Sequence, residues 1–120
     1  MTLKKYIIIN VKGGEVMPIF SFKGVEENHL KEYFKQIEEL ALIMNTDVKK
    51  IVFWNDSSIL IGNGYEKDAI QVKIEWLARP LKQEEVVKHI QNFFTKISKN
   101  IYVIFEEINN FLYINGENKG

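Results

Sequence analysis

The chain has 120 residues, no cysteine, and 16 basic against 16 acidic side chains, so its formal net charge at neutral pH is zero. This balance gives no reason to expect a nucleic acid or an anionic membrane as a partner, and the absence of cysteine excludes disulfides and thiolate sites. Hydrophobic residues make up 46% of the chain, and no apolar run reaches the length of a transmembrane helix or a signal-peptide core, so we expect one cytoplasmic globular domain.

The first half of the chain predicts a strand, a long helix and more strand. Residues 19–23 read Ile-Phe-Ser-Phe-Lys, which is typical of a strand. Apolar residues then recur at spacings of three and four, which predicts one helix from about Glu26 to Asn45. Residues 51–54 and 59–61 both read as strand, either separate or as one interrupted strand. The apolar face of the helix comprises Leu30, Phe34, Ile37, Leu40, Ala41 and Met44.

The second half repeats this order. Residues 70–76 alternate between apolar and polar side chains, the clearest strand pattern in the chain. A helix then opens at Lys82, and residues 101–105 form a near-continuous apolar run, typical of a strand buried on both faces. Residues 111–114 predict a short closing strand, turned by Asn115-Gly116. The apolar face of the second helix comprises Val86, Ile90, Phe93, Phe94 and Ile97.

The two halves resemble each other, and each reads β-α-β. Such a unit normally makes a right-handed crossover between parallel strands. We therefore predict an α/β fold of two β-α-β units related by a pseudo-twofold axis, in which 19–23 pairs with 51–54 and 70–76 pairs with 101–105. A ferredoxin-like domain has the same element order with the strands interleaved differently, and the pattern alone does not separate the two.

Helices that cover one face of a sheet leave the other face open. We expect that open face to carry Phe20, either Phe53 or Trp54, and Trp76. This is more apolar surface than a monomer normally exposes, and oligomerisation is the usual remedy.

No metal site is expected, because the sequence offers no ligand cluster. The two histidines, His29 and His89, are far apart in sequence and fall on charged stretches. We expect each of them on a solvated helix face and not in a ligand pair.

Three segments carry a family resemblance. They are Met17-Pro-Ile-Phe-Ser-Phe-Lys-Gly-Val25, Val72-Lys-Ile-Glu-Trp-Leu-Ala-Arg79, and Val103-Ile-Phe105 with Tyr113-Ile-Asn-Gly116. In this order and at these spacings the chain, from Pro18 to about Asn118, resembles the tautomerase superfamily, which includes 4-oxalocrotonate tautomerase and macrophage migration inhibitory factor. It is most similar to a branch of unknown function. The resemblance implies a homotrimer that needs no cofactor and acts on a small, anionic carbonyl compound.

The chemistry of the superfamily uses proline as the N-terminal residue. Desolvation or a nearby cation lowers the pKa of such an amine towards neutrality. The amine can then take a proton from a carbon next to a carbonyl and return it elsewhere, while an electrophilic group holds the enolate oxygen. The resemblance thus implies a keto–enol tautomerase with Pro18 as general base. In the 120-residue chain, however, the Pro18 nitrogen is a tertiary amide without usable basicity.

The stretch Lys-Gly-Gly-Glu-Val-Met, which ends at Met17, suggests how Pro18 could still become N-terminal. Its codons are compatible with a ribosome-binding site at a sensible distance before a start codon. We therefore expect residues 1–16 to be a mis-annotated leader or a disordered extension, and residues 17–120 to be the tautomerase-like domain, with Pro18 exposed by removal of methionine. The alternative is that residues 3–11 form a genuine extra strand, in which case a non-catalytic trimeric binding module of the same fold is favoured.

Four further residues are implied as substrate-binding. Arg79 lies where the related branch has its arginine and suits a carboxylate or enolate oxygen; the alternative is a surface arginine before a helix. Lys23 stands in for the branch's usual arginine, which keeps the charge but loses the planar fork. Tyr102 falls where migration inhibitory factor has a site tyrosine, although a partly buried strand tyrosine is the alternative. Tyr113 matches the tail motif of the branch.

Overall fold

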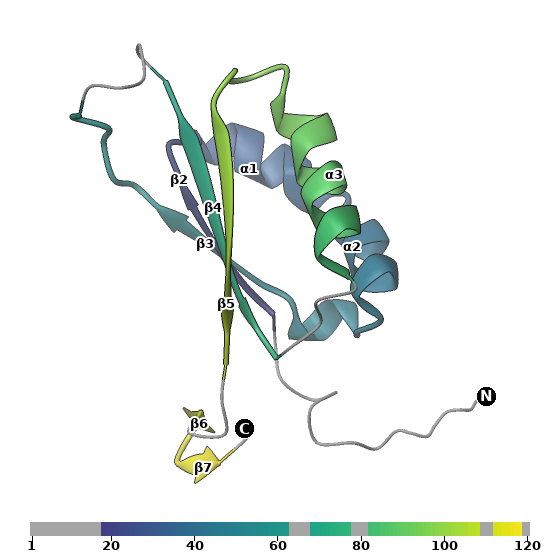
Figure 1. Ribbon diagram of the computed structural model, residues 1–120. Coiled ribbons are helices and arrows are strands. Elements are labelled where there is room, and N and C mark those ends of the chain that lie inside the picture. Colours follow the sequence, from purple (N-terminus) through teal and green to yellow (C-terminus); the bar gives the residue numbers. More distant parts are fainter. Residues whose placement is uncertain (1–17, 63–67, 78–81, 109–111, 119–120) are drawn as a thin grey trace.

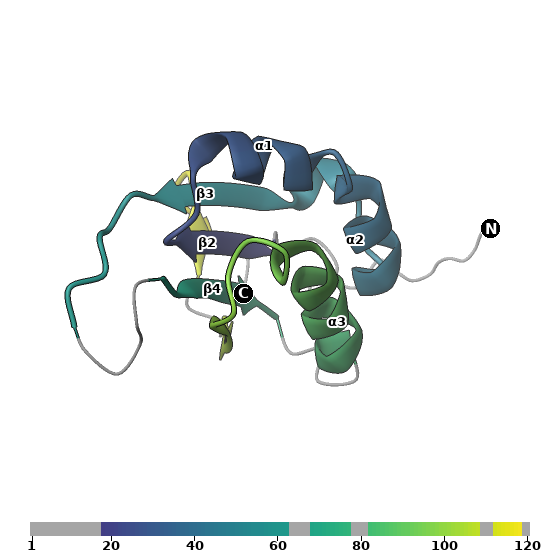
Figure 2. The same cartoon turned by 90° about the horizontal axis from the view of Figure 1, so that it is seen from above.

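A computed structural model describes residues 18–62, 68–77, 82–108 and 112–118. Three helices lie on one face of a four-stranded sheet (Figure 1), and α2 and α3 lie side by side when seen from above (Figure 2). No described helix has the length and apolar character needed to span a membrane. In chain order the elements are β2 (Ile19–Lys23), α1 (Glu27–Phe34), α2 (Ile37–Met44), the 3₁₀ turn η2 (Val48–Lys50), β3 (Val52–Asp56), β4 (Ile70–Trp76), α3 (Gln83–Phe94), β5 (Ile101–Glu107), β6 (Tyr113–Ile114) and β7 (Glu117–Asn118).

The order of strands in the sheet is β3-β2-β4-β5. β2 runs parallel to β3, and β4 runs parallel to β5, so both predicted parallel pairs are confirmed. The two halves meet at the centre, where β2 and β4 run antiparallel. Because each crossover joins neighbouring strands, the fold is the predicted pair of β-α-β units and not the ferredoxin-like arrangement.

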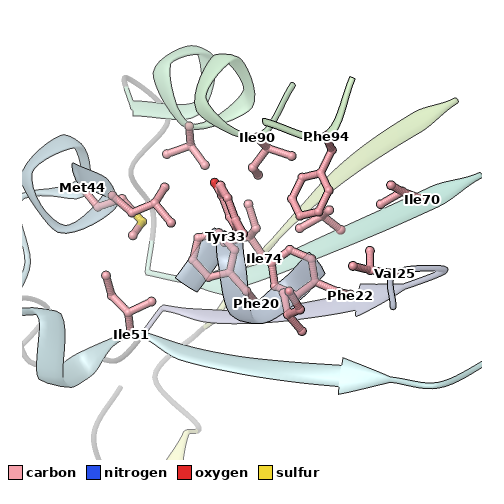
Figure 3. Packing of buried hydrophobic residues seen from close by; sticks show 14 of the residues in the cluster. Phe20, Phe22, Val25, Tyr33, Met44, Ile51, Ile70, Ile74, Ile90 and Phe94 are labelled. Carbon is pink, nitrogen blue, oxygen red and sulfur yellow. The ribbon is translucent and has the colours of Figure 1, made fainter. Parts of the chain in front are cut away.

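The core fills the space between the sheet and the helices (Figure 3). Side chains alternate along a strand, and this places Phe20 and Phe22, both with no exposed surface, towards the helices. The Tyr33 ring from α1 packs against Phe22 and Phe94, with its centroid 6.2 Å from that of Phe22 and 4.9 Å from that of Phe94. Burying each such ring stabilises the fold by about 1.5–3 kcal/mol.

The open face of the sheet carries other residues than predicted. Residues directly opposite each other on neighbouring strands share a face, and Phe20 lies opposite Phe53 and Ile74. Phe20, Phe53 and Trp76 therefore all belong to the helix-covered face, and among the four residues predicted for the open face only Trp54 lies there, 61% exposed. The open face consists of three rows across β3, β2, β4 and β5, which are Val52–Ile19–Glu75–Glu106, Trp54–Ser21–Lys73–Ile104 and Asp56–Lys23–Gln71–Tyr102.

One continuous first helix was predicted, and the structure divides it into α1 and α2. Between them the backbone N–H groups of Lys35 and Gln36 bond to carbonyls three residues back, which is a tighter, 3₁₀-like turn. This turn shifts the phase of the helical face, so that Tyr33 is buried and Phe34, expected on the buried face, is 47% exposed. α2 ends at Met44, and Asn45, the predicted stop, caps it in the left-handed conformation with φ 56°.

Two strand predictions are wrong in part. Residues 59–61 form no strand and are exposed, because β2 ends opposite Asp56 and leaves them no partner in the sheet. β5 forms as predicted but is not buried on both faces. It is an edge strand with helices on one side only, so Tyr102 and Ile104 are 51% and 39% exposed.

Candidate functional site

Pro18 lies immediately before β2 and is buried. Its carbonyl accepts a hydrogen bond of 2.9 Å from the backbone N–H of Val52. Ile19 lies opposite Glu75 in the register of β2 and β4, so Pro18, one residue earlier, lies across from Trp76. Proline suits the position before a strand, because it has no N–H to contribute to the ladder. The proline that the family resemblance singles out thus lies at the buried end of a central strand.

The predicted site residues divide between two ends of the sheet. Lys23 ends β2, five residues after Pro18, and at about 3.3 Å per residue their Cα atoms are roughly 16 Å apart. In the register, Lys23 lies opposite Gln71, and Gln71 lies opposite Tyr102. Lys23 and Tyr102 therefore come together in one row of the open face, and neither reaches Pro18 within one chain.

Lys23 and Tyr102 line a hollow of about 280 Å³ on the open face. Its rim is formed by the segment 58–61, in which Ile59 and Ile61 are 81% and 88% exposed. Within the described residues Lys23 makes no ion pair. Its cross-strand neighbour Asp56 accepts a hydrogen bond from the Ser58 hydroxyl at 2.8 Å. A single ammonium group in a mainly apolar hollow suits a small anion with an apolar body.

Tyr113 lies at the other end of the sheet, in a hairpin of β6 and β7 beyond the end of β5 (Figure 1). The predicted turn is confirmed, because Asn115 and Gly116 both have positive φ, 54° and 83°, as a tight hairpin turn requires. Trp76 lies opposite Glu107, the last residue of β5, so the hairpin leaves the sheet at the end where Pro18 lies. Arg79, the remaining predicted residue, is outside the described residues.

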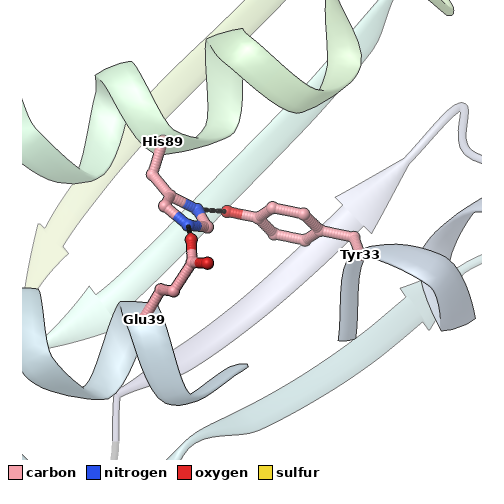
Figure 4. A network of polar contacts seen from close by, with 3 residues as sticks. All are labelled: Tyr33, Glu39 and His89. Carbon is pink, nitrogen blue, oxygen red and sulfur yellow. Dashed lines mark hydrogen bonds and ion pairs between the residues drawn. The ribbon is translucent and has the colours of Figure 1, made fainter. Parts of the chain in front are cut away.

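A polar cluster that was not predicted from the sequence lies between the helices (Figure 4). His89, expected on a solvated face, has a side chain that is only 12% exposed. Its Nδ1 lies 2.9 Å from the Tyr33 hydroxyl and its Nε2 lies 2.7 Å from the Glu39 carboxylate. Because a carboxylate can only accept, Nε2 carries the hydrogen, and Nδ1 of the neutral ring accepts from Tyr33. Burial, and next the charge of Glu39, raise the pKa of Tyr33 above its ordinary value.

The described residues include buried polar atoms without hydrogen-bond partners, but no cluster of metal ligands. Within the described part of the chain, three buried side-chain atoms have no hydrogen-bond partner: His29 Nδ1, Thr46 Oγ1 and Trp76 Nε1. In the same residues no group of three or more histidine, aspartate or glutamate side chains is placed to hold a metal ion. Of the unpaired atoms, Trp76 Nε1 belongs to the residue across from Pro18.

A family model matches most of the chain. Residues 17–119 match the family described as a domain of unknown function, DUF1904. A search of curated protein sequences finds no match.

Solved structures show where the same fold occurs. A DUF1904 domain from Sebaldella termitidis is 17% identical, with a TM-score of 0.77 over 85% of this chain and 99% of that one. A macrophage migration inhibitory factor-like protein from Entamoeba histolytica is 16% identical, with a TM-score of 0.68 over 87% and 99%. A structure described as an R7 fused 4-OT wild-type asymmetric trimer is 8% identical, with a TM-score of 0.67 over 84% and 95%. At these identities the likeness is one of fold, and that fold is the tautomerase fold.

Proposed function

The chain belongs to the DUF1904 family, and from this membership and the position of Pro18 we propose that it is a cytoplasmic, cofactor-independent keto–enol tautomerase. It acts on a small anionic carbonyl compound, with Pro18 as the N-terminal general base. The observation that carries the proposal is that a buried proline begins a central strand, in a chain whose family match starts one residue earlier. Translation from Met17 and removal of that methionine would leave Pro18 with a free secondary amine.

The surroundings of Pro18 support its role as a base. Trp76 lies across from it, and Ile51, which precedes β3, is buried beside it. Apolar neighbours desolvate an amine and disfavour its charged form, so we expect the pKa of a free Pro18 ammonium to be lowered towards neutrality. A lowering of about one unit favours the neutral, proton-accepting form by roughly 1.4 kcal/mol.

A second copy of the chain completes the site. The roughly 16 Å between Pro18 and Lys23 in one chain exceed the reach of a small substrate, so we propose that the Lys23–Tyr102 hollow of another subunit meets Pro18 in a homotrimer. The trimer named in the description of the similar 4-OT structure is consistent with this assembly. Trp54 and Ile104 on the open face supply apolar surface for the contact.

Arg79 and Tyr113 are proposed to bind the substrate at the Pro18 end. Arg79 follows Trp76 by three residues, and its guanidinium suits a carboxylate or an enolate oxygen. Tyr113 is 61% exposed on a hairpin that leaves the sheet at this end, so its hydroxyl is available to a ligand of the same or a neighbouring subunit.

The test compares three proteins in one assay, with folding matched by circular dichroism. The chain that begins at Pro18 should convert phenylenolpyruvate to its keto form. Pro18→Ala in that short chain should largely abolish the activity, because a primary amine differs in basicity and geometry. The 120-residue chain should be inactive, since its Pro18 nitrogen is an amide. Equal activity in the long and short chains would show that Pro18 is not the base.

A non-catalytic binding module is the second candidate. It is favoured by the residues that precede Pro18 in the 120-residue chain, because a retained extension keeps the nitrogen acylated. Mass spectrometry of the protein expressed from its natural upstream DNA separates the two candidates. A species that keeps Met1 favours the binding module, and one that begins at Pro18 favours the enzyme.

A further inference from the structure

Trp76 carries a polar group that its packing does not explain. It ends β4 on the helix-covered face, is 1% exposed, and stacks on Phe105 with ring centroids 4.8 Å apart and planes 25° apart. Its indole N–H is buried, and none of the described residues offers it an acceptor. A buried donor without an acceptor costs free energy, and a phenylalanine would supply an aromatic ring for this stacking without that cost. The indole N–H of Trp76 therefore does not contribute to the stability of the fold, and we consider a role for it in function.

The place of Trp76 in the sheet gives the explanation. Continued by one residue, the antiparallel register of β2 and β4 sets Trp76 directly opposite Pro18. Both residues share the helix-covered face with Phe20 and Ile74, the next pair of that face. Directly opposed residues in an antiparallel pair have Cα atoms about 4.5–5.5 Å apart, so Trp76 and Pro18 are immediate neighbours across the two strands.

Release of the Pro18 amine makes room beside this N–H. In the 120-residue chain the Pro18 nitrogen is bonded to the carbonyl carbon of Met17, about 1.33 Å away. When the chain begins at Pro18, that carbonyl group is gone, and the space next to the amine is open to the carbon that gives up its proton. The substrate oxygen is one carbon further on, and the residue directly across the strand pair from the proline is Trp76.

We propose that the Trp76 indole N–H donates a hydrogen bond to the substrate oxygen during proton transfer at Pro18. The inference rests on the proposed function, since it needs the free amine. Pro18 takes the α-proton, the C–H electron pair forms the new C=C bond, and the carbonyl π pair moves to oxygen. Trp76 holds the resulting oxyanion until the Pro18 ammonium returns the proton. Indole is a donor only, so it stabilises the charge without competing as a base.

The test uses three proteins that all begin at Pro18: the unsubstituted chain, Trp76→Phe, and Trp54→Phe as a matched control on the open face. Kinetics with phenylenolpyruvate are measured together with the thermal midpoint. We expect Trp76→Phe to lower kcat by about 100- to 1000-fold, as loss of one oxyanion donor does, with KM little changed. Its thermal midpoint should change little, because the cavity left by the smaller ring opposes the gain from removing an unpaired donor. Trp54→Phe should lower kcat far less than Trp76→Phe, because it keeps an aromatic ring in the proposed subunit contact.

The kinetic results distinguish failure of the Trp76 proposal from failure of the proposed function. A kcat for Trp76→Phe within about threefold of the unsubstituted chain overturns the Trp76 proposal and leaves the proposed function standing. An inactive unsubstituted chain overturns both. If Trp76→Phe fails to fold, the Trp54→Phe chain decides, since Trp76 is then its only tryptophan. Its fluorescence should respond to the 2-oxo acid 4-methyl-2-oxopentanoate in the chain that begins at Pro18 and not in the 120-residue chain. An unchanged emission in both overturns the proposal.

Discussion

Removing the Tyr33 hydroxyl tests whether the cluster of Tyr33, His89 and Glu39 holds the helices together. In Tyr33→Phe the aromatic packing is kept, but His89 Nδ1 loses the partner that lies 2.9 Å away. The His89 side chain is only 12% exposed, so water replaces that partner poorly. An unsatisfied buried acceptor costs about 1–3 kcal/mol, and the small remaining exposure favours the lower half of that range. We expect the free energy of unfolding to fall by about 1.5 kcal/mol.

Urea unfolding measures this loss. With an m-value of about 1.5 kcal/mol/M, the midpoint should fall by about 1 M. Tyr113→Phe is the matched control, because Tyr113 is 61% exposed, and it should change the stability by less than about 0.5 kcal/mol.

A double-mutant cycle isolates the hydrogen bond. His89→Leu alone leaves the Tyr33 hydroxyl buried among aromatic rings without a partner, and so destabilises the protein as well. Replacing both partners removes both unsatisfied groups. We therefore expect Tyr33→Phe/His89→Leu to cost about 1 kcal/mol less than the sum of the single changes. Single effects that add to within about 0.3 kcal/mol would refute the reasoning.

Burial raises the pKa of Tyr33, so the stability it confers is complete below about pH 10, where an unfolded tyrosine ionises, and is lost as the pH rises further. Unfolding at pH 9 and 11 should show a larger loss in the unsubstituted chain than in Tyr33→Phe. Gly24 has φ 81°, and a Cβ there would collide with the Ala69 carbonyl, so Gly24→Ala should cost at least about 2 kcal/mol, against about 1 kcal/mol for Gly116→Ala, which has similar φ and open space. Light scattering at micromolar concentration should give a trimer, and Trp54→Glu on the open face should dissociate it with the circular dichroism unchanged; a trimer that survives this charge does not use the open face.

The strands could be predicted where the chain alternates cleanly. β4 occupies residues 70–76, as its alternation predicted, because every second side chain had to face the core. The open face could have been predicted better, since Ser21 and Lys23 are the alternatives to Phe20 and Phe22, and a polar pair does not form a core. The number of apolar residues in a sheet does not tell which face carries them, whereas the alternation along each strand does.

Other features had no local signal in the sequence. The turn between α1 and α2 contains neither glycine nor proline, and a spacing of three or four residues fits one helix as well as two. His89 is 50 residues from Glu39 and 56 from Tyr33, so their contact depends on how α3 packs against α1 and α2. The unpaired N–H of Trp76 likewise appears only when the whole environment of the indole is known.

The proposed reaction requires two things that the fold of one chain does not supply. They are a free amine at Pro18 and association with a second chain. The Pro18 nitrogen is an amide in the 120-residue chain, and only a free amine can accept a proton. Lys23 and Tyr102 are joined in one hollow, yet they can act on the same small molecule as Pro18 only if two chains associate. Processing and assembly can be tested separately. If the chain that begins at Pro18 forms trimers but is inactive, the proposed proton transfer at Pro18 is wrong. If that chain is active as a monomer, the Pro18 end of the sheet, which includes Trp76, is sufficient for activity without a second subunit.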